Sequence, residues 1–154
     1  MTAADILVAL RRRHPDREWG FFPELRVGTG YRKTRGRSAK YEPWEQRIDL
    51  WVINYFPSRH LERIAYEIKT TRGDFRNELK HPEKRKAAME LSNRFYFVAP
   101  EGVLWEGDMP PYCGLLEVRG DGSFRLARSA PWRECDKPPW RFVAGLARRV
   151  VRSG

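Results

Sequence analysis

The sequence predicts a single α/β domain of the mixed α+β kind, and three observations carry this prediction. The chain has 154 residues, about the usual size of one domain. Hydrophobic residues make up 41% and aromatic residues 13% of it, which is enough apolar material for one packed core. Segments of strand and helix character follow one another in the order helix, three strands, helix, strand, hairpin, helix. We expect one domain over residues 1–154, with a core over about 3–100 and an added hairpin and helix over about 101–154.

The first half of the chain predicts one helix and three strands. Residues 3–13 are expected to be helical, because Thr2 can cap the start and the apolar residues recur on one face. Residues 19–27 are rich in aromatic and β-branched residues and predict a strand. The nearly continuous apolar run of residues 47–56 is typical of a strand covered on both faces. Residues 63–71 follow a period of two, which predicts a third strand.

The second half predicts a helical region, a fourth strand, a hairpin and a last helix. The helical region is expected to open with Asp74 as its N-cap and to restart at Pro82, since proline suits the first turn of a helix. Residues 94–100 predict the fourth strand, and residues 115–127 predict a hairpin around a Gly-Asp-Gly turn. A Pro-rich link leads to an Arg-rich helix over about 140–151.

Positive charge is unevenly distributed along the chain. The chain has 30 Lys and Arg against 20 Asp and Glu, a net charge of +10. Genomic codon bias can explain a preference for Arg over Lys, but it does not explain the net charge. Residues 26–47 mix glycines, cations and aromatics, and they predict a flexible basic loop able to follow a phosphate backbone, with a solvated surface loop as the alternative. The basic residues of this segment are Arg26, Arg32, Lys33, Arg35, Arg37, Lys40 and Arg47.

Several classes of protein are excluded by composition and spacing. No apolar run approaches the ~20 residues that span a bilayer, and the N-terminal segment has the reverse charge order of a signal peptide. We therefore expect an intracellular, cytoplasmic protein without membrane contact. Cys113 and Cys135 support neither a disulfide framework nor a cysteine-rich zinc site. The three histidines are scattered without zinc-ligand spacing, and no GxSxG motif indicates a serine nucleophile.

Three ionisable residues stand where strands are expected to be buried. Asp49 interrupts the apolar run of the second strand, and Glu67 and Lys69 share one face of the third. Two carboxylates ~4 Å apart repel by about 4 kcal/mol at an effective dielectric of ~20, and a divalent cation such as Mg²⁺ turns that repulsion into a binding site. Alternatively, Glu67 pairs with Lys69, and Asp49 pairs with Arg47.

These residues resemble the motif of the PD-(D/E)xK, or restriction-endonuclease-like, nuclease superfamily. The match is Asp49 in RIDLW and Glu67-Ile68-Lys69 in YEIKT, with Asp49 and Glu67 18 residues apart. The expected αβββαβ order over residues 3–100 is similar to the common core of that superfamily. The stretch TTRGDF…LKHPEKRKAAMEL…RFYFVAP resembles small bacterial and phage members, including MmcB-like DNA-repair proteins. Ile48 stands where the family motif has proline, which is not needed chemically because the carboxylate is the ligand.

The resemblance implies a metal-dependent DNA endonuclease acting in repair, recombination, or phage or restriction processing. Asp49, Glu67 and the Ile68 carbonyl would bind Mg²⁺, with Mn²⁺ as a substitute, and Lys69 would activate water or stabilise developing charge. A homodimer is expected in many such enzymes, because two strands need two sites. RNA as the substrate stays open, and so does a non-catalytic nucleic-acid-binding module on a nuclease fold. A basic interaction protein would leave the three ionisable residues unexplained.

Further candidates complete the expected site. An additional acidic ligand is expected from an earlier element, either Glu24 or, failing that, Asp5; alternatively, Glu24 pairs with Arg26 or Arg47. A phosphate-binding surface is also expected, and for its helical part a simple solvated face is the alternative. The candidate nucleic-acid-binding residues are Arg32, Lys33, Arg35, Arg37, Lys40, Arg47, Thr71, Arg72, Lys80, Lys84 and Lys86, with Arg85 on the same helical segment.

Overall fold

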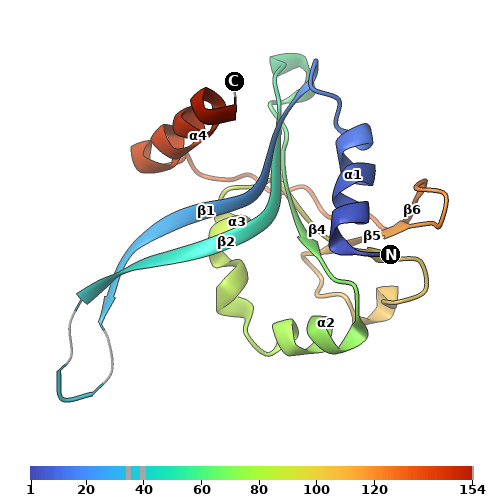
Figure 1. Ribbon diagram of the computed structural model, residues 1–154, viewed down its shortest axis with the longest axis horizontal. Coiled ribbons are helices and arrows are strands. Elements are labelled where there is room, and N and C mark those ends of the chain that lie inside the picture. Colours follow the sequence, from blue (N-terminus) through green and yellow to red (C-terminus); the bar gives the residue numbers. More distant parts are fainter. Residues whose placement is uncertain (34–35, 39–40, 154) are drawn as a thin grey trace.

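Six strands form one mixed sheet in which the spatial order of the strands equals their order in the chain (Figure 1). The computed structural model describes the backbone of residues 1–33, 36–38 and 41–153, and the side chains of residues 1–28, 36–38 and 45–152. The helices and strands are α1 (Ala3–Arg13), β1 (Trp19–Lys33), β2 (Tyr41–Asn54), β3 (Arg63–Ile68), α2 (Arg72–Leu79), α3 (Lys86–Glu90), β4 (Arg94–Pro100), β5 (Gly114–Val118), β6 (Phe124–Arg128) and α4 (Trp140–Ser153). Short 3₁₀ turns are η1 (Pro57–Arg59), η2 (Pro82–Arg85) and η3 (Glu106–Asp108).

The sheet is antiparallel at its two edges and parallel in its middle. β1, β2 and β3 pair antiparallel, β3, β4 and β5 pair parallel, and β6 returns antiparallel to β5. A parallel pair needs a crossover connection, and the segment with α2, η2 and α3 supplies it between β3 and β4. This fold is an α+β architecture, as the sequence predicts.

The two faces of the sheet carry two separate cores because strand side chains alternate. On one face, Trp51 and Phe97 pack with Phe75 of α2 and Phe142 of α4. On the other face, the sheet is covered by the apolar side of α1. Within β3, Ala65 belongs to the first core, whereas Ile64 and Tyr66 belong to the second. The predicted alternation of this strand is therefore confirmed, and it places Glu67 and Lys69 on the face that carries α2, α3 and α4.

Most of the predicted elements are present with close boundaries. The helix over residues 3–13 and the strand over residues 94–100 match the prediction. Thr2 caps α1 through its hydroxyl, and Pro82 opens the turn that restarts the helical region. The predicted hairpin is formed by β5 and β6, but β5 pairs with β4 and so continues the main sheet. Within residues 101–154, β5 and β6 thus continue the sheet, and Phe142 of α4 packs on the core of one face.

The predicted flexible basic loop over residues 26–47 is wrong in most of its length. β1 continues to Lys33 and β2 begins at Tyr41, so the two strands project as a long twisted ribbon (Figure 1). Their pairing runs through Lys33 opposite Tyr41, with a register shift between Gly28 and Tyr31. A two-stranded ribbon satisfies backbone hydrogen bonds without burying its side chains, so a charged sequence is compatible with it.

The N-cap of α2 also differs from the prediction. Strand β3 ends at Ile68, and Thr71 caps the helix with its hydroxyl accepting a hydrogen bond from the Asp74 N–H at 3.1 Å. Asp74 therefore lies in the first turn of α2, where its negative charge faces the positive end of the helix dipole. None of the helices in the described ranges has the length and apolar character that crossing a membrane requires.

Candidate active site

Strands β2 and β3 separate at the point where the predicted acidic residues stand. Their ladder pairs Leu50 with Tyr66, and continuing this register would place Asp49 opposite Glu67. In place of the next ladder hydrogen bond, the Ile68 N–H donates to Asp49 Oδ2 at 2.9 Å. The side chain of Asp49 thus occupies the space where the strands part, on the same face as Glu67.

The opening between the strands leads into a cavity of about 440 Å³. Asp49, Glu67 and Lys69 all line it, so the structure brings the three predicted residues together. Their side chains are only 21%, 18% and 14% exposed, respectively. The remaining walls come from β2, α2 and η2, through Glu45, Gln46, Arg47, Glu78, Glu83, Lys84 and Arg85.

Lys69 is held by a chain of buried charges. Its Nζ lies 2.8 Å from Glu78 Oε1 and 3.6 Å from Glu67 Oε1. Glu78 Oε2 in turn lies 3.3 Å from Arg85 Nη1, and Arg85 Nη2 donates to the Tyr112 hydroxyl at 3.0 Å. Burial alone lowers the pKa of Lys69, but the hydrogen bond and charge of Glu78, then Glu67, outweigh burial and raise it. Lys69 is therefore a fixed positive charge inside the cavity.

The surroundings of Lys69 favour its charged form, whereas those of Glu67 disfavour its charged form. Burial raises its pKa to about 9, and the negative charges of Asp49 and Glu78 add to the effect, while Lys69 opposes it. The carboxyl group of Glu67 therefore keeps its proton near neutral pH as long as no cation is bound. A cation beside Asp49 and Glu67 would remove the cause of the repulsion and displace this proton.

The donor atoms at this position fit a hard divalent cation. Asp49 and Glu67 offer carboxylate oxygens, which Mg²⁺ prefers. Lys69 N–H donates to Val98 O on β4, so the N–H and carbonyl of Ile68 leave β3 on the opposite edge, toward Asp49. Among the described residues, no group of three or more His, Cys, Asp or Glu side chains is arranged to hold a metal. A site here would consist of two carboxylates, the Ile68 carbonyl and water.

Neither of the additional acidic candidates reaches the cavity. The pairing of β1 with β2 passes from Pro23–Leu50 to Leu25–Ile48, and Glu24 between them has a left-handed φ of 48°. This irregularity breaks the simple alternation on which the prediction rested, and Glu24 lines a different cavity beside α4. Its alternative partner, Arg26, instead lies 4.0 Å from Glu45.

Asp5 lies on the wrong side of the sheet. It belongs to α1, which packs on the opposite face, and its Oδ2 accepts a hydrogen bond from Thr2 N at 2.8 Å. Together with the Thr2 hydroxyl, this contact forms a capping box, so Asp5 stabilises the start of α1.

The predicted phosphate-binding residues divide into those at the cavity and those elsewhere. Arg47 and Lys84 are exposed and line the cavity, and Arg47 Nη2 lies 3.9 Å from Asp49 Oδ1. Lys80 and Lys86 are exposed on the helical segment, where Lys86 pairs with Glu90 at 3.9 Å. Arg37 is exposed, and the side chains of the other four predicted residues in the ribbon, Arg32, Lys33, Arg35 and Lys40, lie outside the described residues.

Three members of the predicted phosphate-binding set have structural roles instead. Thr71 is not on β3 but caps α2, as its hydroxyl accepts from Asp74 N. The Nε of Arg72 donates to the Val103 carbonyl at 3.4 Å. Arg85 is 3% exposed and is bound to Glu78, so it does not belong to a solvated basic face.

Two residues that build the cavity were missed by the sequence predictions. Glu78 follows Phe75 by three residues, so it shares the buried face of α2, and a buried carboxylate requires a charged partner. Gln46 ties β2 to the helical segment, because its Nε2 donates to Glu83 O at 2.7 Å and its Oε1 accepts from Ala87 N at 2.8 Å. The helical periodicity is the signal for Glu78; for Gln46 the sequence holds none.

Comparison with known proteins bears on the fold alone. No protein-family model matches the chain, and no curated protein sequence matches it significantly. Among solved structures, the chain is similar to SPO1766, a protein of unknown function from Silicibacter pomeroyi, with a TM-score of 0.60 and 18% sequence identity. The match covers 99% of this chain and 89% of that chain. The whole chain, from α1 through α4, therefore shares an α+β fold with that protein.

Proposed function

We propose that the protein is a metal-dependent nuclease that hydrolyses DNA phosphodiester bonds. The observation that carries the proposal is the convergence of Asp49, Glu67 and Lys69, from two adjacent strands, in one cavity. These are the residues in which the sequence resembles the PD-(D/E)xK motif. Their position where the neighbouring strands β2 and β3 part supports the proposal.

Hydrolysis of a phosphodiester needs a nucleophile at neutral pH and positive charge near the phosphate. Mg²⁺ or Mn²⁺ held by Asp49, Glu67 and the Ile68 carbonyl would supply both when bound. The protein keeps these donors in place without help from the cation. Ile68 N–H fixes Asp49 Oδ2, and the register of β2 and β3 sets Glu67 beside it.

Lys69 is placed to act electrostatically. Its ammonium group is 3.6 Å from Glu67 and is anchored by Glu78, so its position is set before a substrate arrives. A fixed ammonium in a largely buried cavity stabilises negative charge that develops on phosphate oxygens more strongly than an exposed one does. Arg47 and Lys84, exposed at the cavity, add charges that attract a phosphate backbone.

A nucleic-acid-binding module without activity is the second candidate. One observation favours it: Lys69 already has a close partner in Glu78 at 2.8 Å, which a purely structural charge cluster would also show. The two candidates differ in what happens to a bound strand. The first requires cleavage that depends on a divalent cation, and the second requires binding alone.

A substrate panel separates the candidates. The protein is incubated with end-labelled linear, nicked, flapped and four-way DNA and with single-stranded RNA, in Mg²⁺, in Mn²⁺ and in EDTA. We expect at least one DNA substrate to be cut in Mg²⁺ or Mn²⁺ and none to be cut in EDTA. Cutting that persists in EDTA contradicts the metal site, and binding without cutting of any substrate contradicts a nuclease.

A further inference from the structure

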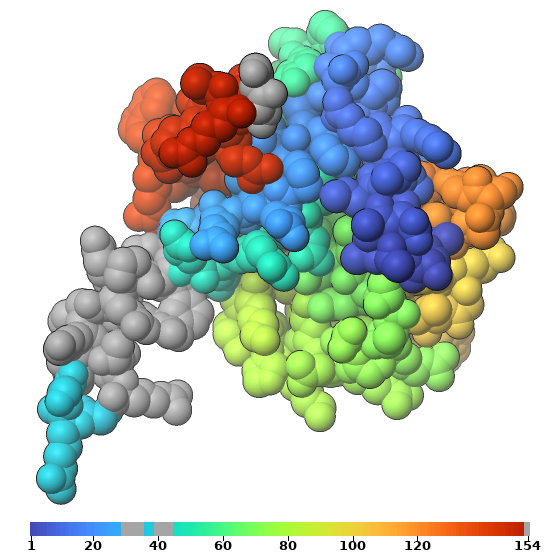
Figure 2. All heavy atoms as spheres, in the orientation of Figure 1, coloured from blue at the N-terminus to red at the C-terminus, as the bar shows by residue number. Residues whose placement is uncertain are grey.

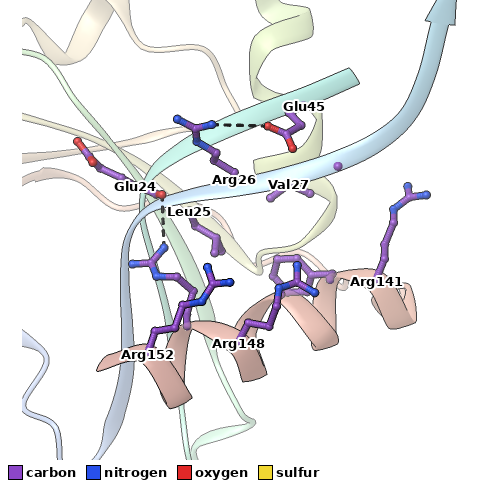
Figure 3. A pocket seen from close by; sticks show the side chains of 12 residues that line it. Glu24, Leu25, Arg26, Val27, Glu45, Arg141, Arg148 and Arg152 are labelled. Carbon is purple, nitrogen blue, oxygen red and sulfur yellow. Dashed lines mark hydrogen bonds and ion pairs between the residues drawn. The ribbon is translucent and has the colours of Figure 1, made fainter. Parts of the chain in front are cut away.

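A second cavity, of about 480 Å³, lies between β1 and α4, and its lining is strongly basic. We call it the α4 groove (Figure 3). Its charged lining residues are five arginines, Arg26, Arg141, Arg148, Arg149 and Arg152, and two carboxylates, Glu24 and Glu45. The lining therefore has three positive charges in excess, and four of its five arginines are on α4, which the sequence predictions did not assign to nucleic acid.

Three of these arginines form a row along one side of α4. Arg141, Arg148 and Arg152 follow helical spacing, and Figure 3 shows them projecting from α4 into the space beside β1. Gly145 lies within the row and adds no side chain, and Nη2 of Arg148 lies 3.8 Å from the position of a Cβ atom there. The first and last arginine are eleven residue steps apart on the helix, a length of ~16 Å, or about five steps of 3.4 Å along a DNA strand.

The α4 helix is fixed to the sheet by other residues, so the row has a defined position. Phe142 is buried and packs edge to face against Trp51, with 5.2 Å between the ring centres. Arg149 donates to the carbonyls of Pro23 and Glu24, at 2.7 and 3.4 Å. Arg149 therefore anchors the helix to β1.

The guanidinium groups of the row itself are available to a ligand. Arg141, Arg148 and Arg152 are exposed, and the described part of the chain gives them no acidic partner. A phosphate that binds to them therefore has no ion pair to break, and the planar guanidinium matches two phosphate oxygens.

The α4 groove adjoins the candidate active site. Glu45 lines both the groove and the cavity that holds Asp49, Glu67 and Lys69. Both cavities also lie on the same face of the sheet. Leu25 and Phe142 line the groove and belong to the core that contains Ala65, and Glu67 of the candidate active site shares the face of Ala65 on β3. A chain of phosphates in the groove would therefore continue into the candidate active site.

We propose that the α4 groove binds the phosphate backbone of DNA and leads it into the cavity of Asp49 and Glu67. This inference rests on the proposed function for its substrate, but its test does not depend on cleavage. A membrane surface fits the groove less well. A helix that lies on a membrane buries its apolar side in lipid, whereas Phe142 and Leu146 of α4 pack on the core of the protein. Among the described residues of this helix, the exposed large apolar ones are only Trp140, Val143, Val150 and Val151.

The test compares two double variants with the same loss of charge. Arg141→Gln with Arg148→Gln removes two charges from the groove. Arg12→Gln with Arg13→Gln removes two exposed charges from the end of α1, where Arg13 stacks over Phe124 of β6. That strand is at the opposite edge of the sheet from β1, so this pair is the matched control. Circular dichroism confirms that both variants are folded.

Binding of a fluorescein-labelled DNA duplex is measured by anisotropy in EDTA, between about 50 and about 200 mM salt. The groove variant is expected to lose roughly tenfold or more in affinity at the low-salt end, and its slope of log affinity against log salt is expected to flatten by about 1.8. The control is expected to keep the wild-type slope. Arg141→Lys with Arg148→Lys keeps both charges and is expected to restore most of the slope. A groove variant that binds like the control overturns the inference.

Further measurements distinguish DNA from other ligands, and they distinguish the inference about the groove from the proposed nuclease function. Loss of binding confined to a labelled RNA or to phosphatidylserine vesicles, with DNA binding unchanged, overturns the assignment to DNA. Groove-dependent DNA binding by a protein that cuts nothing in Mg²⁺ supports the groove and contradicts the nuclease. Metal-dependent cutting that the groove variant performs as well as the control supports the nuclease and contradicts the groove.

Discussion

Replacing Glu67 by glutamine is expected to stabilise the metal-free protein, and to do so increasingly as the pH rises. The pKa of Glu67 is raised from 4.5 to about 9, first by burial and then by Asp49 and Glu78. Between these two values the folded protein holds a proton that the unfolded chain releases. The contribution of Glu67 to stability is therefore fully present below pH 4.5 and is lost as the pH rises toward 9.

The size of this change in stability depends only on the one proton that Glu67 binds on folding. One proton taken up on folding changes the free energy of unfolding by about 1.4 kcal/mol for each pH unit. A glutamine side chain does not titrate, so the stability of Glu67→Gln minus that of the wild type is expected to grow by about 3 kcal/mol between about pH 5.5 and about pH 7.5. Asp49→Asn removes part of the repulsion and is expected to flatten the pH dependence of the wild type.

Urea unfolding followed by tryptophan fluorescence, in EDTA at several pH values, measures this difference. Glu83→Gln is the matched control, because Glu83 lines the same cavity but its side chain is 60% exposed. The control is expected to keep the wild-type pH dependence. Parallel curves of stability against pH for wild type and Glu67→Gln would refute the reasoning, since they would mean that Glu67 titrates alike in the folded and unfolded chain.

Three other predictions follow from the structure. Burial, with smaller effects of Arg13 and Arg11, lowers the pKa of His14 from 6.5 to about 3. The free energy of unfolding is therefore expected to fall as the pH drops below 6.5. In an acid titration followed by circular dichroism, His14→Asn is expected to weaken that fall. Phe142→Ala is expected to cost about 3 kcal/mol in urea unfolding and to weaken DNA binding, because Phe142 anchors α4 on Trp51. Mn²⁺ binding at about pH 7 is expected to release close to one proton in calorimetry across buffers of different ionisation enthalpy, and Glu67→Gln should release none.

The central part of the site could be predicted because it depends on strand geometry. A period of two puts Glu67 and Lys69 on one face, and the antiparallel pairing of β2 with β3, which ends at Leu50 opposite Tyr66, leaves Asp49 and Glu67 next to the last pair and in one cavity. Both features are local or involve neighbouring strands of the chain. The residue types, two carboxylates with a lysine, are the basis of the proposal of metal-dependent hydrolysis.

The parts that could not be predicted depend on tertiary contacts or on local irregularity. The partner of Lys69 is Glu78 on α2, and the orientation of that helix over the cavity is not encoded in the pattern of β3. Glu24 does not lie on the expected face, because β1 is irregular opposite Asp49. Glu24 itself has a positive φ, which glutamate rarely adopts. The role proposed for Arg148 and its row depends on the packing of α4 beside β1, which joins distant parts of the chain.

The space-filling view places the two proposals on one molecule. In Figure 2, α4 (red) stands beside the described part of β1 (blue), and the segment with α2, η2 and α3 (light green) lies at the bottom of the same view. The groove and the cavity share Glu45, so β2 borders both of them at this residue. DNA following the groove would pass this part of β2 on its way to Asp49.

The most direct test of the central claim is single-turnover cleavage of a labelled DNA substrate in Mg²⁺ by wild type, Asp49→Asn and Glu83→Gln. Asparagine keeps the oxygen that accepts from Ile68 N–H, so Asp49→Asn removes a charge with little change in shape. Wild type and Glu83→Gln are expected to cut at similar rates, and Asp49→Asn is expected to cut at least ~10²-fold more slowly while binding the same DNA. Equal cutting by Asp49→Asn and Glu83→Gln would contradict a nuclease site at Asp49, Glu67 and Lys69.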